Sequence, residues 1–145
     1  MTYSKKRGLA SYGEVAVSSD VAYASPHRLV QMLMEGALDK IATAKGHIER
    51  GEHDGKSRHI TWAVSIINGL RSALDMEQGG EIANNLNDLY DYMTRRLMEA
   101  VVSNDTEILD EVSSLLTEIK GAWDALPDSV KSPSVAARES RPAVG

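Results

Sequence analysis

The sequence predicts an all-α protein, an antiparallel up-down four-helix bundle preceded by a short N-terminal helical or capping segment. Apolar residues recur at steps of three and four along four stretches, and helix start and stop signals separate these stretches. No stretch alternates apolar and polar residues as a strand would. Because short turns join the predicted helices, consecutive helices are expected to pack as antiparallel neighbours. We expect a mobile N-terminal segment at residues 1–24, the bundle at residues 25–126 and a disordered tail at residues 127–145.

The first predicted helix begins at Ser25 and Pro26. A serine can cap the free amide groups at a helix start, and a proline at the first helical position loses no helical hydrogen bond. Gly51 supplies the stop signal at the other end. The apolar stripe between these signals consists of Leu29, Leu33, Ala37, Ile41, Ala44 and Ile48.

The second predicted helix covers about residues 56–76, and Gly79 and Gly80 separate it from the third. Glu81 lies in the first turn of the third helix, where a carboxylate meets the positive end of the helix dipole. The stripe of the second helix consists of Ile60, Ala63, Val64, Ile67 and Leu74. The stripe of the third consists of Ile82, Leu86, Leu89, Met93, Leu97 and Ala100.

The fourth predicted helix follows Asn104, which with Glu107 three residues later resembles a capping box. Its stripe consists of Ile108, Val112, Leu115, Ile119, Ala122 and Leu126. Each helix alone would be marginally stable in water, so we expect burial of the four stripes against one another to stabilise the bundle.

The composition is that of a small cytosolic (cytoplasmic) protein. The 145 residues contain no cysteine, which excludes disulfides and thiolate metal sites and suits a reducing compartment. No apolar run follows the basic N-terminal residues, and no stretch approaches the roughly 18 apolar residues of a membrane span. The formal net charge of −5 argues against nucleic acid as a partner, because nucleic-acid affinity depends largely on basic residues.

The first two predicted helices are apolar over a wider arc than one core requires. A bundle helix needs an apolar stripe only a little wider than 100°. On a helical wheel the apolar arc covers about 200° in the second helix and about half the circumference in the first. A contiguous apolar surface that the core does not use usually marks an interaction site, and an amphipathic helix would fit between two such helices. The candidate partner-binding residues are Met34, Leu38, Trp62, Ile66, Leu70 and Ala73, with Tyr90 and Met93 as candidates that could equally belong to the core.

The histidines do not show the spacing of a metal site. His47, His53 and His59 recur every six residues, which does not place them on one helix face. A di-iron bundle needs a carboxylate three residues before a histidine, and no histidine here has one. The acidic residues of the third helix have no evident partner base. We therefore expect no metal, no cofactor and no catalytic residues.

Two alternatives to a partner-binding module remain open. His47, with Arg50 and Gly51 after it, resembles the exposed histidine of a histidine phosphotransfer domain, although the end of a helix also explains Gly51. A structural helical homodimer could instead use the surplus apolar surface to bind a second copy of the chain.

Three stretches resemble the FliS family of flagellin-specific export chaperones. They are ASPHRLVQMLMEGAL (residues 24–38), GGEIANNLNDLYDYMTRRL (residues 79–97) and NDTEILDEVSSLL with EIKGAW (residues 104–123). The resemblance covers about residues 12–126 in order. Many members carry an aromatic residue in place of Met34 and an aspartate in place of Glu35, and Tyr3 only loosely fills the place of a second N-terminal tyrosine.

This resemblance implies a non-enzymatic, cytosolic helical bundle that binds the disordered C-terminal segment of flagellin. It implies that binding prevents premature polymerisation and that the loaded chaperone meets the flagellar type III export gate. It also implies that an N-terminal segment covers part of the binding surface when the partner is absent. Candidate residues of this cover are Tyr12, Val15 and Val17.

Overall fold

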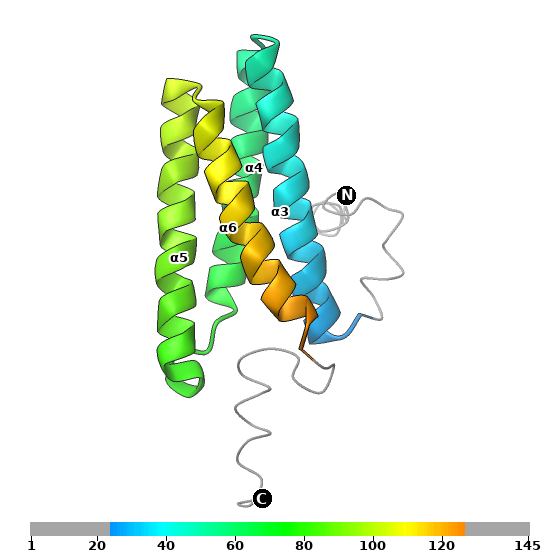
Figure 1. Cartoon of the computed structure of the whole chain (residues 1–145), viewed down its shortest axis with the longest axis vertical. Coiled ribbons are helices and arrows are strands. Elements are labelled where there is room, and N and C mark those ends of the chain that lie inside the picture. The colour runs from blue at the N-terminus through cyan, green and yellow to red at the C-terminus, as the bar shows by residue number, and fades with distance from the viewer. Residues whose placement is uncertain (1–23, 127–145) are drawn as a thin grey trace, which may run out of the picture.

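The computed structural model describes residues 24–126, which form four α-helices. They are α3 (Pro26–Glu49), α4 (His53–Ser72), α5 (Met76–Ser103) and α6 (Thr106–Asp124), shown in Figure 1. Consecutive helices pack side by side and α6 returns to α3, so the four helices form a closed ring. The predicted all-α bundle is confirmed. The predicted tail, and the N-terminal segment except for its last residue, lie outside the described residues.

The start and end of α3 agree with the predicted signals. The hydroxyl of Ser25 accepts a hydrogen bond of 3.1 Å from the amide of Arg28, and Pro26 is the first helical residue. The helix ends at Glu49, and Gly51 follows with a φ of +72°. That left-handed conformation favours glycine, which has no β-carbon to clash with the backbone. Local side-chain chemistry therefore sets both ends of α3.

The boundaries of α4 and α5 differ from the prediction. Helix α4 begins and ends a few residues earlier than expected, at His53 and Ser72. Helix α5 begins at Met76, but Gly80 interrupts it with a φ of +55° and a ψ of −132°. The regular part of α5 therefore begins at Glu81, as the two glycines predicted.

The predicted capping box at Asn104 is wrong. Asn104 has a φ of 58° and ends α5 in the left-handed conformation, which asparagine tolerates better than most residues. The cap of α6 is Asp105, whose carboxylate accepts a 2.9 Å hydrogen bond from the amide of Glu107. One residue thus ends α5 and the next one starts α6.

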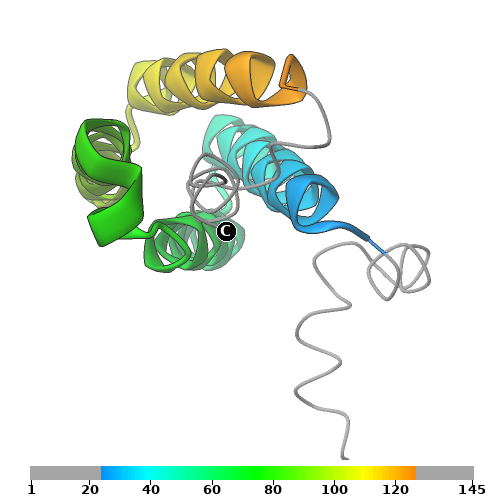
Figure 2. The same ribbon diagram turned by 90° about the horizontal axis from the view of Figure 1, so that it is seen from below.

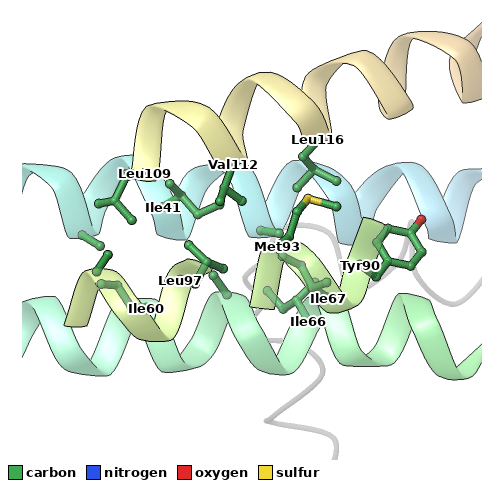
Figure 3. Packing of buried hydrophobic residues seen from close by; sticks show 14 of the residues in the cluster. Ile41, Ile60, Ile66, Ile67, Tyr90, Met93, Leu97, Leu109, Val112 and Leu116 are labelled. Carbon is green, nitrogen blue, oxygen red and sulfur yellow. The ribbon is translucent and has the colours of Figure 1, made fainter. Parts of the chain in front are cut away.

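All four helices contribute to one aliphatic core, part of which is shown in Figure 3. Its largest fully buried side chains are Met34, Ile41, Ile60, Ile66, Ile67, Met93, Leu97, Leu109, Val112 and Leu116. Burying each of these side chains contributes about 1.5–3 kcal/mol relative to leaving it exposed, so the core supplies most of the stability of the bundle. None of the helices within residues 24–126 is long and apolar enough to cross a membrane.

Helix α6 is inclined, so its start contacts both α5 and α3, whereas its end lies beside the start of α3. Near its start, Glu111 accepts a 2.5 Å hydrogen bond from the hydroxyl of Tyr92 on α5. At its end, the indole Nε1 of Trp123 donates a 3.0 Å hydrogen bond to the carbonyl of His27 on α3. Figures 1 and 2 show the C-terminal end of α6 beside the start of α3 and away from the start of α5. The first half of α5 therefore lacks the cover that α6 gives to its second half.

Candidate functional site

A row of apolar side chains follows the first half of α5 and becomes more exposed toward its start. We call Ile82, Leu86 and Leu89 the α5 row. Together with Met93 they are spaced by four, three and four residues, so they lie on one side of the helix. Met93 is 0% exposed, Leu89 is 36% exposed and Ile82 is 68% exposed, with Leu86 half-buried between them. The α5 row thus continues the hydrophobic core onto the surface.

The inclination of α6 explains this gradient. Glu111 faces α5, and Leu115, Glu118 and Ala122 follow it at helical spacing on the same side of α6. Leu115 is half-buried, whereas Glu118 and Ala122 are exposed, because α6 has moved away from α5 at that level. The α5 row and this side of α6 therefore form the two sides of one open, largely apolar face.

Polar contacts connect α5 and α6 just after the α5 row along the chain. Glu111 accepts hydrogen bonds from the Tyr92 hydroxyl and, at 2.9 Å, from Nε of Arg96. These bonds lower the pKa of Glu111, and the same carboxylate raises the pKa of the Tyr92 hydroxyl. Inside the bundle, burial raises the pKa of Tyr90 to about 12, so this phenol stays neutral. The network of Tyr92, Arg96 and Glu111 thus closes the face at one end, and the face is open toward Ile82.

Charge is distributed unevenly over the bundle. Residues 24–74 contain seven lysines and arginines and five carboxylates, whereas residues 75–126 contain three and twelve. No basic side chain lies between Arg71 and Arg95. The α5 row therefore lies on the strongly acidic half of the molecule.

Most of the predicted partner-binding residues lie in the core. The expectation that they form an open surface is wrong for Met34, Ile66 and Leu70, each at most 3% exposed. Tyr90 and Met93, for which a core role was the equal alternative, are buried to the same degree. Ile66 of α4 packs against α3, where even a β-carbon built at Gly36 would lie in ordinary van der Waals contact, 3.6 Å from Cδ1 of Ile66. A wide apolar arc is also needed by a helix that packs against two neighbours in a ring.

The other predicted residues are at least partly accessible. Leu38 and Trp62 are half-buried, and Ala73 is exposed. The ammonium group of Lys40 lies 3.9 Å from the ring centroid of Trp62, which is a cation–π contact across α3 and α4. A role for these residues in partner binding stays a prediction. The proposed cover residues Tyr12, Val15 and Val17 lie outside the described residues.

Sequence reasoning missed the α5 row as a surface. Its three residues belong to the predicted core stripe of the third helix, and their spacing cannot reveal that α6 leaves them uncovered. The absence of basic residues between Arg71 and Arg95 was the available signal, because it indicates a distinct surface along α5.

His47 does not have the setting of a phosphotransfer histidine. Its Nδ1 lies 2.7 Å from Oε1 of Glu52, and its ring lies 5.1 Å from that of His59, centroid to centroid. A β-carbon built at Gly55 would lie only 2.5 Å from the His47 ring, so the imidazole is packed closely against α4. Within residues 24–126, no three His, Asp or Glu side chains are grouped so as to hold a metal ion.

Comparison with known proteins places the chain in a family. The family model described as "Flagellar protein FliS" matches residues 8–130. The Flagellar secretion chaperone FliSB of Pseudomonas aeruginosa is 49% identical over 120 residues, which cover 83% of this chain and 95% of that protein. The Flagellar secretion chaperone FliS of Salmonella typhimurium is 43% identical over 92% of this chain and 96% of its own length. The one from Bacillus subtilis is 34% identical over 72% and 77%. The chain therefore belongs to the FliS family, a family of flagellar secretion chaperones and not of enzymes.

Proposed function

We propose that this chain binds the disordered C-terminal segment of flagellin in the cytosol, prevents its premature polymerisation and delivers it to the flagellar type III export apparatus. Membership of a family of flagellar secretion chaperones supports the general role. The observation that carries the proposal is the α5 row, where the core continues onto the surface with Ile82 68% exposed.

The physical basis is mutual burial of apolar surface. A disordered flagellin segment cannot bury its own apolar side chains, and it loses conformational entropy only when it binds. An amphipathic helix presents apolar residues at i, i+3, i+4 and i+7, which match the spacing of Ile82, Leu86 and Leu89. Packing such a helix between the α5 row and α6 would remove apolar surface of both proteins from water.

The accessible residues on α3 and α4 form a second proposed contact. An extended segment that continues around the bundle would meet Trp62, Ala73 and Leu38. The buried candidates would then pack beneath this surface and not contact the partner. They are Met34, Ile66, Leu70, Tyr90 and Met93. The N-terminal cover, with Tyr12, Val15 and Val17, would compete with flagellin for the surface. Release at the export gate requires only that the chaperone bind flagellin more weakly there than in the cytosol.

Titration calorimetry of the full chain with a peptide of the flagellin C-terminal segment tests this function. We expect a one-to-one complex with a negative heat-capacity change, because binding buries apolar surface. In a parallel assay, an equimolar amount of the chain should suppress the growth of seeded flagellin filaments, measured by light scattering. Excess peptide should restore growth. Absence of binding at micromolar concentrations would remove flagellin as the partner.

A further inference from the structure

We infer that the segment received by the α5 row is a basic amphipathic helix, with lysine or arginine flanking its apolar stripe. The inference rests on the proposed function, because it assigns a charge to the segment that this surface binds. Its evidence is different: it comes from two carboxylates beside the α5 row that form no ion pair with any described residue.

Carboxylates flank the α5 row on both sides. Asp88 precedes Leu89 on α5, and Glu118 lies on the side of α6 that faces α5 at its start. Both are exposed, and neither forms an ion pair or a side-chain hydrogen bond with any part of the chain that the structure describes. These two carboxylates are therefore available to a partner.

Two neighbouring carboxylates, those of Asp91 and Glu111, form ion pairs. Asp91 accepts a 3.3 Å bond from Arg71 and a 3.0 Å bond from Arg95, and Glu111 is bound by Arg96. The bundle thus pairs its acidic residues where α4, α5 and α6 meet and leaves Asp88 and Glu118 unpaired where the α5 row is exposed. A helix on the α5 row would place its flanking side chains within a Debye length of both carboxylates, which is about 8 Å at physiological ionic strength.

Charge also discriminates between possible occupants. A second copy of this chain using the same face would bring its own acidic residues against Asp88 and Glu118, and like charges in contact oppose association. A neutral apolar helix would gain from burial alone. A basic helix gains from burial and from both unpaired carboxylates, so it is the occupant that the face fits best.

Model peptides test the charge preference without prior choice of a partner. Three peptides about five helical turns long are needed. The first has a leucine stripe with lysine on the other face, and the second has glutamate in place of each lysine. The third has the composition of the first in an order that abolishes the stripe. We expect only the first to bind tightly, with the second and third weaker by about a hundredfold or more.

Charge reversal locates the binding site. The double variant Asp88→Lys, Glu118→Lys should bind the basic peptide about tenfold more weakly at physiological salt, because each site exchanges an attraction for a repulsion. The matched control, Asp39→Lys with Glu49→Lys, makes the same change in net charge on exposed positions of α3. It should bind the peptide as the wild type does, within about a factor of two.

The outcomes separate this inference from the proposed function. Equal affinity for the lysine and glutamate peptides, or an equal loss in the two double variants, would overturn the inference. So would a dimer, seen by sedimentation, that Ile82→Asp dissociates, since the α5 row would then bind a second copy. A flagellin peptide that binds the wild type and Asp88→Lys, Glu118→Lys equally would leave the proposed function standing and overturn the charge preference. Binding of the basic peptide without binding of the flagellin peptide would support the charge preference and remove flagellin as the partner.

Discussion

Lys56 at the start of α4 donates a 2.7 Å hydrogen bond to Oδ1 of Asn104 at the end of α5. The same ammonium group donates a 2.8 Å bond to the carbonyl of Val101, and Lys56 is only 5% exposed. No carboxylate pairs with it among the described residues. The partially negative C-terminal end of α5 instead stabilises the charge, because its last carbonyls have no helical partners. This contact connects the start of α4 to the turn between α5 and α6.

We expect Lys56→Met to lower the free energy of unfolding by about 1–3 kcal/mol. Methionine keeps the apolar stem but leaves the Val101 carbonyl and the Asn104 amide without their charged donor. Urea unfolding followed by far-UV circular dichroism measures the loss. Lys45→Met is the control, since Lys45 forms an exposed ion pair with Asp110 at 2.9 Å and should cost less. Equal losses in the two variants would contradict a structural role for the buried ammonium.

The two glycines of α4 should respond oppositely to alanine. A β-carbon at Gly55 would lie 2.5 Å from the His47 ring, so Gly55→Ala must displace a packed imidazole. We expect a loss of about 1–3 kcal/mol. At exposed Gly69 a β-carbon would meet nothing within 4 Å, so Gly69→Ala should gain about 0.5–1 kcal/mol from higher helix propensity. Thermal unfolding compares the two variants, and a gain at position 55 would show that α3 and α4 lie farther apart.

The network around Glu111 predicts a defined pH dependence. Hydrogen bonds from Tyr92 and Arg96 lower the pKa of Glu111, so its ionised form favours the folded state. That contribution is fully present above the unfolded-state pKa of a glutamate, about 4.3, and is lost as the pH falls through the lower folded pKa. Glu111→Gln should be less stable than the wild type at neutral pH, and the difference should shrink below about pH 4. Urea midpoints from pH 7 to pH 3 measure it, and a constant difference would rule out this linkage.

Ile66→Asp should unfold the bundle. Ile66 is 1% exposed, and an aspartate there would have to bury its carboxylate without a partner. We expect a loss of about 4 kcal/mol or more, which is a large part of the stability of a small domain. Circular dichroism should show lost helicity at room temperature or a much lower melting temperature. A variant that keeps the wild-type melting temperature would mean that Ile66 is at the surface, as the sequence had suggested.

Local signals in the sequence predicted the helices well because each acts within one turn. Ser25 and Pro26 mark the start of α3 and Gly51 marks its end, as expected, and the glycine pair before Glu81 marks the break in α5. The prediction at Asn104 was wrong because asparagine suits both a helix start and a left-handed helix end. In the structure the positive φ of Asn104 and the cap hydrogen bond of Asp105 distinguish the two roles.

The binding surface could not be predicted in the same way, because it depends on how α6 is inclined. Ile66 and Ile82 both belong to apolar stripes, yet Ile66 is 1% exposed and Ile82 is 68% exposed. The difference comes from the packing of Ile66 between α4 and α3 and from the departure of α6 from α5. Neither relation is visible in the periodicity of a single helix. The acidic character of residues 75–126 was visible, and the α5 row belongs to that part of the chain.

The central claim is that the α5 row binds flagellin, and titration calorimetry of Ile82→Asp with the flagellin C-terminal peptide tests it most directly. Val102→Asp is the matched control, because Val102 is 83% exposed on the same helix but lies at its other end. Both variants should keep the wild-type fold, since both positions are exposed. We predict about tenfold or more weaker binding for Ile82→Asp and unchanged binding for Val102→Asp. Wild-type affinity in Ile82→Asp would contradict the claim.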